Sequence, residues 1–217
     1  MHLYIAYKNY SSWSLRPWLA LKVAGIDFVE TLIPFAHTDD LDKLGKKYRI
    51  PAQVPILMDE GHVIWDSLAI MEYVAELYPK QNLWPQEKWL RAFARSASSE
   101  MHSGFMALRS GCPMNCRSQK SKTVTPAIQA DLGRLREIWD HFSAIDKPEG
   151  DFLCGEFGIV DAMYAPIMWR VTGYGLKVSP AFSHWAKAMQ ALPALQEWLA
   201  SARSEAWIME HYEAMRD

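Results

Sequence analysis

Cysteine is scarce in this sequence, and it is unevenly distributed. The 217-residue chain has three cysteines, Cys112, Cys116 and Cys154, all in its second half. An odd, sparse set excludes a disulfide-stabilised scaffold and favours a reducing compartment. Neither Cys112 nor Cys116 has a second Cys or His pair at zinc-ligand spacing, so we expect no metal. The cysteine-free first half also excludes a Cys-x-x-Cys redox centre there.

An excess of one charge sign and long apolar runs are also missing. Lys and Arg number 23 against 25 Asp and Glu, a formal net charge of -2, and we expect no nucleic acid partner. No apolar run approaches the ~18 residues of a membrane-spanning helix, so we expect no membrane partner. Residues 1–7 alternate like a strand and carry no basic region, unlike a signal peptide. These features together predict a cytoplasmic protein.

The first 79 residues do contain an alternation of strand and helix signals. Strands are predicted at 2–7, 28–33, 55–58 and 62–65, and the turn 59–61 joins the last two into a hairpin. Leu15, Trp18, Leu19 and Val23 share one face of a predicted helix that Gly25 can end. A weak helical signal covers 37–50 and a clear one covers 68–78. The resulting order, β-α-β-α-β-β-α, is typical of a thioredoxin-like α/β domain.

Strand signals stop after a linker at 80–87. Helical spacing then appears at 88–110, 124–144, 158–172, 180–189 and 193–201, with Gly and Pro residues between these segments. We therefore predict a thioredoxin-like domain at 1–79, a linker at 80–87, and an all-helical bundle at 88–217.

Four short motifs occur in a fixed order along the chain. Ser11-Ser12-Trp13-Ser14-Leu15-Arg16 follows the first strand, and Gln53-Val54-Pro55 precedes the third. Asp66-Ser67 opens the helix after the hairpin, and Gly158-Ile159-Val160-Asp161 opens a helix of the second domain. Together the four motifs resemble those of the glutathione transferase family, over essentially the whole chain. The Ser–Ser pair with an arginine five residues after the first serine resembles the serine-type, zeta-like class.

The resemblance implies the cytosolic glutathione transferase architecture, a thioredoxin-like domain followed by a helical bundle. It implies glutathione as co-substrate, a small electrophile as second substrate, and a homodimer. The 10 Trp and 11 Met of the chain suit an adaptable apolar pocket. Trp13 departs from the zeta-like pattern, which often has Cys there, and its indole could narrow the pocket beside the sulfur.

The resemblance assigns the catalytic position to Ser11, with Ser12 as a helper. The first N–H groups of a helix lack internal partners and carry partial positive charge, which stabilises a thiolate, and a serine hydroxyl adds one donor. Two alternatives stay open. Ser11, Ser12 or Ser14 can be an ordinary helix cap, and Tyr7, at the end of strand one, is a rival donor.

Glutathione is expected along the remaining motifs of the first domain. If the bond before Pro55 is cis, the Val54 backbone faces outward and can pair with the peptide as an added strand. Ser67 and the start of its helix suit the γ-glutamyl carboxylate, and Asp66 suits the ammonium. For the glycyl carboxylate, the candidates are Gln53, together with His37, Lys46 and Lys47. The alternatives are a plain loop proline, a plain helix cap and a solvated polar loop.

In the second domain, Met101 and Phe105 have helical spacing. They are candidates for a wall of the second-substrate pocket, although ordinary core is the simpler interpretation. Glu100 and His102 are expected in solvent or at a subunit interface. Asp161 is expected to accept hydrogen bonds at the start of its own helix, a structural role.

The sequence therefore predicts a glutathione S-transferase that conjugates the glutathione thiolate to small electrophiles or isomerises an activated double bond. Maleylacetoacetate isomerase-type chemistry is a candidate for the second activity. The alternatives are a glutathione-dependent peroxidase and a non-catalytic glutathione-binding or interaction protein with the same fold, because fold alone does not decide activity.

Overall fold

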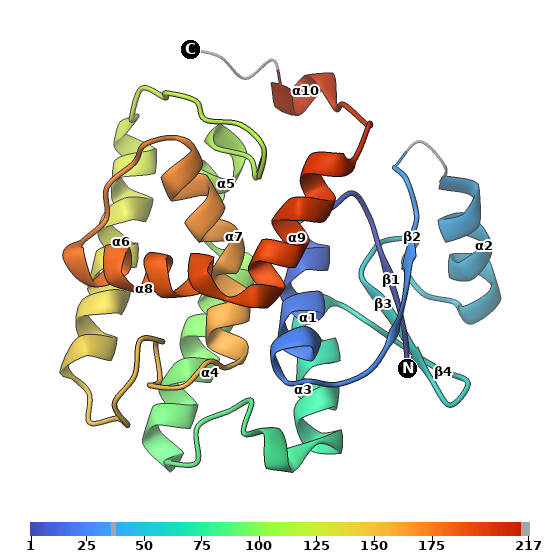
Figure 1. The fold of residues 1–217 in the computed structure, drawn as a ribbon, viewed down its shortest axis with the longest axis horizontal. Helices are drawn as coiled ribbons and strands as arrows, with labels where there is room; N and C mark the ends of the chain where they lie inside the picture. The colour runs from blue at the N-terminus through green and yellow to red at the C-terminus, as the bar shows by residue number, and fades with distance from the viewer. Residues whose placement is uncertain (36–37, 214–217) are drawn as a thin grey trace.

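The computed structural model describes residues 1–35 and 38–213 (Figure 1). The sheet is formed by β1 (His2–Ile5), β2 (Val29–Leu32), β3 (Ile56–Asp59) and β4 (His62–Trp65). The other elements of the first half are α1 (Ser12–Val23), α2 (Thr38–Tyr48), α3 (Ser67–Leu77) and the 3-10 turn η1 (Pro79–Gln81). The second half holds α4 (Lys88–Ser103), α5 (Met106–Gly111), α6 (Pro126–Ala144), α7 (Ile159–Gly173), α8 (Pro180–Ala191), α9 (Pro193–Ser204) and α10 (Glu210–Glu213). The predicted fold, a thioredoxin-like half followed by a helical half, is confirmed.

The sheet has the strand order β2-β1-β3-β4. β2 pairs parallel to β1, which requires the crossover that α1 supplies, while β3 and β4 are antiparallel and form a hairpin. α1 and α3 cover the face of the sheet toward the helical half, and α2 covers the other face (Figure 1). On that outer face, Leu41 of α2 packs in a small separate core with Ile33, Ile50 and Ile56.

Helix α1 is shared by the two halves of the molecule. It packs on β1 and α3 on one side and on α7 and α9 on the other. Leu15, Trp18 and Leu19 are all 0% exposed. Arg16 is buried as well, and its Nε donates to the Met163 carbonyl of α7 over 3.0 Å. The second domain thus holds the helix whose first residues were predicted to be catalytic.

The helix predicted at 88–110 is in fact two helices, and this prediction was wrong. α4 ends at Gly104, where a Cβ atom would lie 2.7 Å from the Glu100 carbonyl oxygen. Phe105 follows with a left-handed φ of 58°, and α5 then runs in a new direction. The apolar spacing that links Met101 to Phe105 continued through the break, so periodicity alone did not reveal it.

The start of α7 is closely packed against the chain that leads into α4. The Ile159 N–H donates to the Leu83 carbonyl over 2.9 Å, and a Cβ at Gly158 would lie 2.8 Å from the same oxygen. Glycine is therefore required at this cap. The Asp161 carboxylate accepts from the backbone N–H groups of Gly158 and Leu153, at 2.9 and 3.0 Å, in the structural role that the sequence predicted. Burial raises the pKa of Asp161 to about 6.

Candidate active site

The loop between β1 and α1 ends in a pair of hydrogen-bonded serine hydroxyls. Ser11 caps α1, with its Oγ 3.4 Å from the Ser14 N–H and 2.7 Å from Ser14 Oγ. Ser14 Oγ accepts from the Ala6 N–H of the preceding strand over 3.1 Å. Both hydroxyls are buried, and Ser11 retains 6% exposure. Ser11 is therefore a helix cap, and it also lines one of two clefts that meet at this loop.

The first cleft, here the proline-loop cleft, has a volume of about 360 Å³. It is lined by Trp13, Pro51, Gln53, Val54, Pro55, Trp65, Asp66, Ser67 and His102. The Val54–Pro55 peptide bond is cis, as the sequence interpretation required. The structure therefore brings together all five residues that were predicted to bind glutathione, and it adds Pro51, Trp65 and His102, which were not predicted there.

Asp66 and Ser67 form the polar end of the proline-loop cleft. Asp66 Oδ1 caps α3 by accepting from the backbone N–H groups of Leu68 and Ala69, at 2.9 and 3.1 Å. Asp66 adopts a left-handed φ of 73°, a conformation that is unfavourable for a residue with a side chain. Ser67 is 1% exposed, and its Oγ has no hydrogen-bond partner among the described residues. A buried hydroxyl of this kind at a helix N-terminus is suited to bind an anion.

The second cleft, here the arginine cleft, has a volume of about 550 Å³. The lining that it shares with the proline-loop cleft consists of Trp13, Gln53 and Val54. Its remaining lining comes from several segments: Tyr10, Ser11, Ser12, Phe35, Leu41, Ala52, Met106, Arg109, Ser110, Pro113, Met114, Arg170 and Tyr212. The two clefts thus meet beside the N-terminus of α1, and a ligand group at that point is accessible from both.

Arg109 and Arg170 give this cleft a cationic floor, and the buried Arg16 lies against its lining residue Trp13. The guanidinium of Arg16 lies 4.2 Å from the Trp13 ring centre and that of Arg109 lies 4.9 Å from it. Arg170 donates to the carbonyls of Arg109 and Cys112 over 2.7 Å each, and to Ser12 Oγ over 3.4 Å. Arg16 Nη1 and Arg170 Nε are buried without a hydrogen-bond partner in the described chain.

The burial of these arginines affects their proton affinity. Burial, followed by the charge of Arg109, lowers the pKa of Arg170 to about 10. Burial likewise holds the pKa of Arg16 well below its ordinary value, and it lowers the pKa of Arg109. An anion in the cleft would favour the charged form of these arginines, because an opposite charge nearby offsets part of the cost of their burial.

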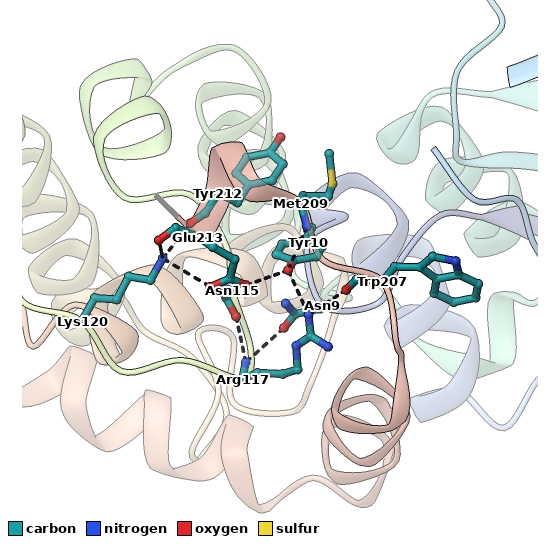
Figure 2. Close-up of polar contacts among 9 residues, drawn as sticks. All are labelled: Asn9, Tyr10, Asn115, Arg117, Lys120, Trp207, Met209, Tyr212 and Glu213. Atoms are coloured by element: carbon teal, nitrogen blue, oxygen red, sulfur yellow. Dashed lines mark hydrogen bonds and ion pairs between the residues drawn. The ribbon is translucent and has the colours of Figure 1, made fainter. Parts of the chain in front are cut away.

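The C-terminal strap, residues 205–213, contributes Tyr212 to the lining of the arginine cleft, and Figure 2 shows polar contacts that hold this strap in place. The Glu205 carboxylate accepts from the backbone N–H groups of Lys8 and Asn9, at 2.6 and 3.1 Å. Arg117 donates to the Trp207 carbonyl and to the Tyr10 hydroxyl, over 2.9 Å each. The strap is thereby attached to the loop that leads into Ser11.

The end of the strap is attached to the same loop. The Tyr10 hydroxyl donates to Glu213 Oε1 over 2.6 Å, and Asn115 Nδ2 donates to the same oxygen over 2.8 Å (Figure 2). The rings of Tyr10 and Tyr212 stack at 5.5 Å, and both line the arginine cleft. The strap is therefore fixed to the loop before Ser11 and supplies Tyr212 to the cleft lining.

Some residues singled out from the sequence lie elsewhere. Met101 and Phe105 are 0% and 5% exposed in the main core and do not line either cleft, whereas Trp13 lines both. The Tyr7 ring packs against Phe35 and Trp207, and it lines neither cleft. Glu100 forms an ion pair with Arg134. Lys46 and Lys47 lie in the last turn of α2. His37 lies outside the described residues.

Other residues of the two clefts were missed by sequence reasoning. His102 was expected in solvent or at a subunit interface, but its Nε2 lies 2.5 Å from Asp66 Oδ2 in the proline-loop cleft. Arg109, Arg170 and Tyr212 line the arginine cleft. Their only signal in the sequence is their residue type, because the contacts that bring them together join distant parts of the chain.

The described residues contain neither a cluster of metal ligands nor a membrane-spanning helix. Within residues 1–35 and 38–213, no group of three or more His, Cys, Asp or Glu side chains is arranged to hold a metal ion. No helix in the same part of the chain combines the length and the apolar character needed to span a bilayer. The three cysteines are buried and form no disulfide bond within the described residues.

Comparisons with known proteins give consistent results for both halves. The family model of the glutathione S-transferase N-terminal domain matches residues 10–77, and that of the C-terminal domain matches residues 125–201. Maleylacetoacetate isomerase of Rattus norvegicus is 29% identical over 203 residues, 89% of this chain and 89% of the relative. The probable maleylacetoacetate isomerase of Caenorhabditis elegans is 34% identical over 183 residues, 82% of each chain. In fold, a crystallised glutathione transferase homologue from Burkholderia with bound glutathione is similar at a TM-score of 0.69 and 24% identity, covering 94% of this chain and 98% of that one.

Proposed function

The chain belongs to the glutathione S-transferase family, and from that premise we propose that its two clefts divide one reaction between them. Glutathione occupies the proline-loop cleft, and a small electrophile occupies the arginine cleft. The activity is that of a glutathione transferase, in which the thiolate attacks a soft electrophilic carbon. The observation that carries the division is that the clefts share Trp13, Gln53 and Val54 beside the N-terminus of α1.

The chemistry of the proline-loop cleft supports this placement of glutathione. Its γ-glutamyl carboxylate suits the unpartnered Ser67 hydroxyl and the N-terminus of α3, where peptide N–H groups and the helix dipole favour an anion. Its ammonium group suits the Asp66 carboxylate. Its backbone extends along Val54, and the glycyl carboxylate reaches the Gln53 side of the cleft. The cysteinyl sulfur then lies near the start of α1.

We assign activation of the thiol to the Ser11 hydroxyl, supported by Ser14. Ser11 and Ser14 share a hydrogen bond of 2.7 Å. A hydroxyl hydrogen rotates freely, so Ser11 can turn its O–H toward a bound sulfur while Ser14 donates to Ser11 Oγ. The thiolate gains one donor and the cap remains satisfied. Ser12, which already accepts from Arg170, acts as a helper at most.

The cationic floor of the arginine cleft favours an electrophile that carries a carboxylate. Arg109 and Arg170 line the cleft, and the unpartnered Arg170 Nε can donate to an anion. This chemistry is suited to isomerising an acidic substrate with an activated double bond, as the names of the relatives suggest. The thiolate adds to the double bond, rotation occurs about the resulting single bond, and elimination regenerates both thiolate and alkene. Glutathione is thus recovered unchanged.

A paired assay tests the proposal. We expect the protein to bind to glutathione resin and to isomerise a cis ene-dione carboxylic acid in the presence of glutathione. We expect slower conjugation of a neutral aryl halide, because that electrophile leaves the arginines unpaired. Binding to the resin without turnover of either electrophile would indicate the non-catalytic alternative. Failure to bind glutathione at all would contradict the proposal.

We also propose that the protein acts as a homodimer in a reducing compartment, the cytoplasm. The aromatic side chain of Trp89, which is 68% exposed, supports a further contact surface. Buried cysteines without a disulfide bond among the described residues are compatible with a reducing compartment. Sedimentation at micromolar concentration is expected to give about twice the chain mass, and a 24.9 kDa species would contradict the dimer.

A further inference from the structure

His102 links the second domain to the residue that we assign to the ammonium group of glutathione. It lies in the last turn of α4, and its Nε2 is 2.5 Å from Asp66 Oδ2 at the start of α3. Both side chains are about one third exposed, 35% for His102 and 37% for Asp66. The contact therefore lies at the surface of the proline-loop cleft, where a ligand can reach it.

The two oxygens of the Asp66 carboxylate have different partners. Oδ1 is held by the N–H groups of Leu68 and Ala69 and caps α3. Oδ2 is held by His102 alone among the described residues. The two N–H groups restrain the carboxylate through Oδ1, and His102 adds a restraint at the oxygen that faces the cleft. Oδ2 still has a lone pair for a second donor.

The ring of His102 is itself held in place. It packs against the Trp13 indole, with ring centres 5.1 Å apart and planes tilted by 56°. Its backbone carbonyl accepts from Arg109 Nη1 over 3.2 Å. His102 is thus a fixed donor rather than a mobile surface side chain, which is the property needed to orient a carboxylate before a ligand arrives.

We propose that His102 is a positioning residue for glutathione: it orients Asp66 Oδ2 toward the γ-glutamyl ammonium and so determines how tightly that end of the peptide binds. This inference rests on the proposed function, because it takes glutathione to be the ligand of the proline-loop cleft. It assigns no role to His102 in the chemistry at sulfur. The effect is therefore expected in the affinity for glutathione and in its KM, with kcat preserved.

The test compares His102→Ala with His102→Gln, since the glutamine amide retains one N–H donor. His102→Ala is expected to raise the Kd and KM of glutathione about three- to tenfold, the effect of losing one orienting hydrogen bond. His102→Gln is expected to restore both to within about twofold of wild type. In an Asp66→Asn background, His102→Ala is expected to add little, because the two residues act as one unit.

A ligand analogue separates positioning from general damage to the cleft. Glutaryl-cysteinyl-glycine lacks only the ammonium group of glutathione, so its Kd should be the same in wild type and in His102→Ala. The matched control is His184→Ala. His184 Nε2 lies 2.9 Å from Asp151 Oδ1, and both side chains are exposed and line neither cleft. Loss of this contact should change neither the Kd of glutathione nor that of the analogue.

Three results would overturn the inference while the wild-type protein still binds glutathione. The first is an unchanged glutathione Kd in His102→Ala. The second is an equal loss of affinity for glutathione and for the deaminated analogue. The third is a His102→Gln variant that melts like wild type but binds glutathione as weakly as His102→Ala. A wild-type protein that binds no glutathione would overturn the proposed function itself, and with it this inference.

Discussion

The two clefts of this molecule are adjacent but are built in opposite ways. The proline-loop cleft is formed mainly by short continuous stretches, the loop 51–55 and the turn into α3, and it offers backbone groups, a helix N-terminus and Ser67. The arginine cleft is formed by side chains from several loops and helices that are far apart in the sequence, and by Tyr212 of the C-terminal strap. The first arrangement suits one constant peptide ligand. The second can change its ligand through single substitutions, since few of its walls depend on backbone geometry.

The largest effect is expected at the point where the clefts meet. Ser11→Ala removes the hydroxyl that we assign to the thiolate. A hydrogen bond to a charged group is worth about 1.5–3 kcal/mol, so the pKa of the bound thiol should rise by roughly one to two units. The kcat at neutral pH should then fall roughly ten- to a hundredfold and partly recover in alkali, while glutathione affinity changes little. Ultraviolet titration of the bound thiolate measures this directly.

The control for Ser11→Ala must account for the lost helix cap. Ser179→Ala is matched, because Ser179 caps α8 in the same manner, accepting from the Phe182 N–H over 3.1 Å. It should cost a similar ~1 kcal/mol of stability without any change in the thiol titration. If Ser12→Ala or Tyr7→Phe shifts the titration while Ser11→Ala does not, the assignment of the hydroxyl is wrong.

A substitution in the arginine cleft should affect charged and neutral electrophiles differently. Arg109→Gln removes a cation from the cleft wall. For a carboxylate-bearing electrophile, kcat/KM should fall about ten- to thirtyfold, the loss expected for one charge-assisted hydrogen bond. For a neutral aryl halide it should change less than about threefold. Equal losses of kcat/KM for both electrophiles would show that Arg109 shapes the cleft but does not recognise the charge of the substrate.

The converse substitution acts on the proline-loop cleft. Asp66→Asn keeps an oxygen to cap α3 but removes the negative charge opposite the proposed ammonium. The KM for glutathione should rise about tenfold and the KM for the electrophile should stay unchanged, since such binding is equal in ground and transition states. Steady-state kinetics with each substrate varied in turn checks this. A change confined to the electrophile KM would reverse our assignment of the clefts.

The smallest effect is expected from the C-terminal strap. Tyr10→Phe retains the stacking on Tyr212 but removes the hydrogen bonds to Glu213 and Arg117. We expect a loss of about 1–2 kcal/mol in unfolding free energy and about a threefold change in electrophile KM. Glutathione Kd should not change. Chemical denaturation and steady-state kinetics measure the two effects, and a larger change for glutathione than for the electrophile would contradict the division of the clefts.

The contrast between the two clefts explains which site residues could be predicted from the sequence and which could not. Strands, most helices and the proline-loop cleft are encoded in short stretches, so Val54, Pro55, Asp66 and Ser67 could be identified from local motifs. Arg170 and Tyr212 could not, because their place in the cleft follows from long-range packing. His102 meets Asp66 across 36 positions of sequence, and nothing in either residue's neighbourhood indicates the other. Phe105 was misplaced because its spacing continued a helix that Gly104 had already ended.

The C-terminal strap also has a consequence for how the protein is made. The contact between Lys8 and Glu205 joins residues 197 positions apart. At roughly 5–20 residues per second, a ribosome needs roughly 10–40 s between synthesising the two ends of that contact. Throughout that interval the loop before Ser11 has been made but its last partners have not. A chain that stopped at residue 205 would keep the strands and helices β1 to α9, yet it would lack Tyr212 in the cleft that we assign to the electrophile.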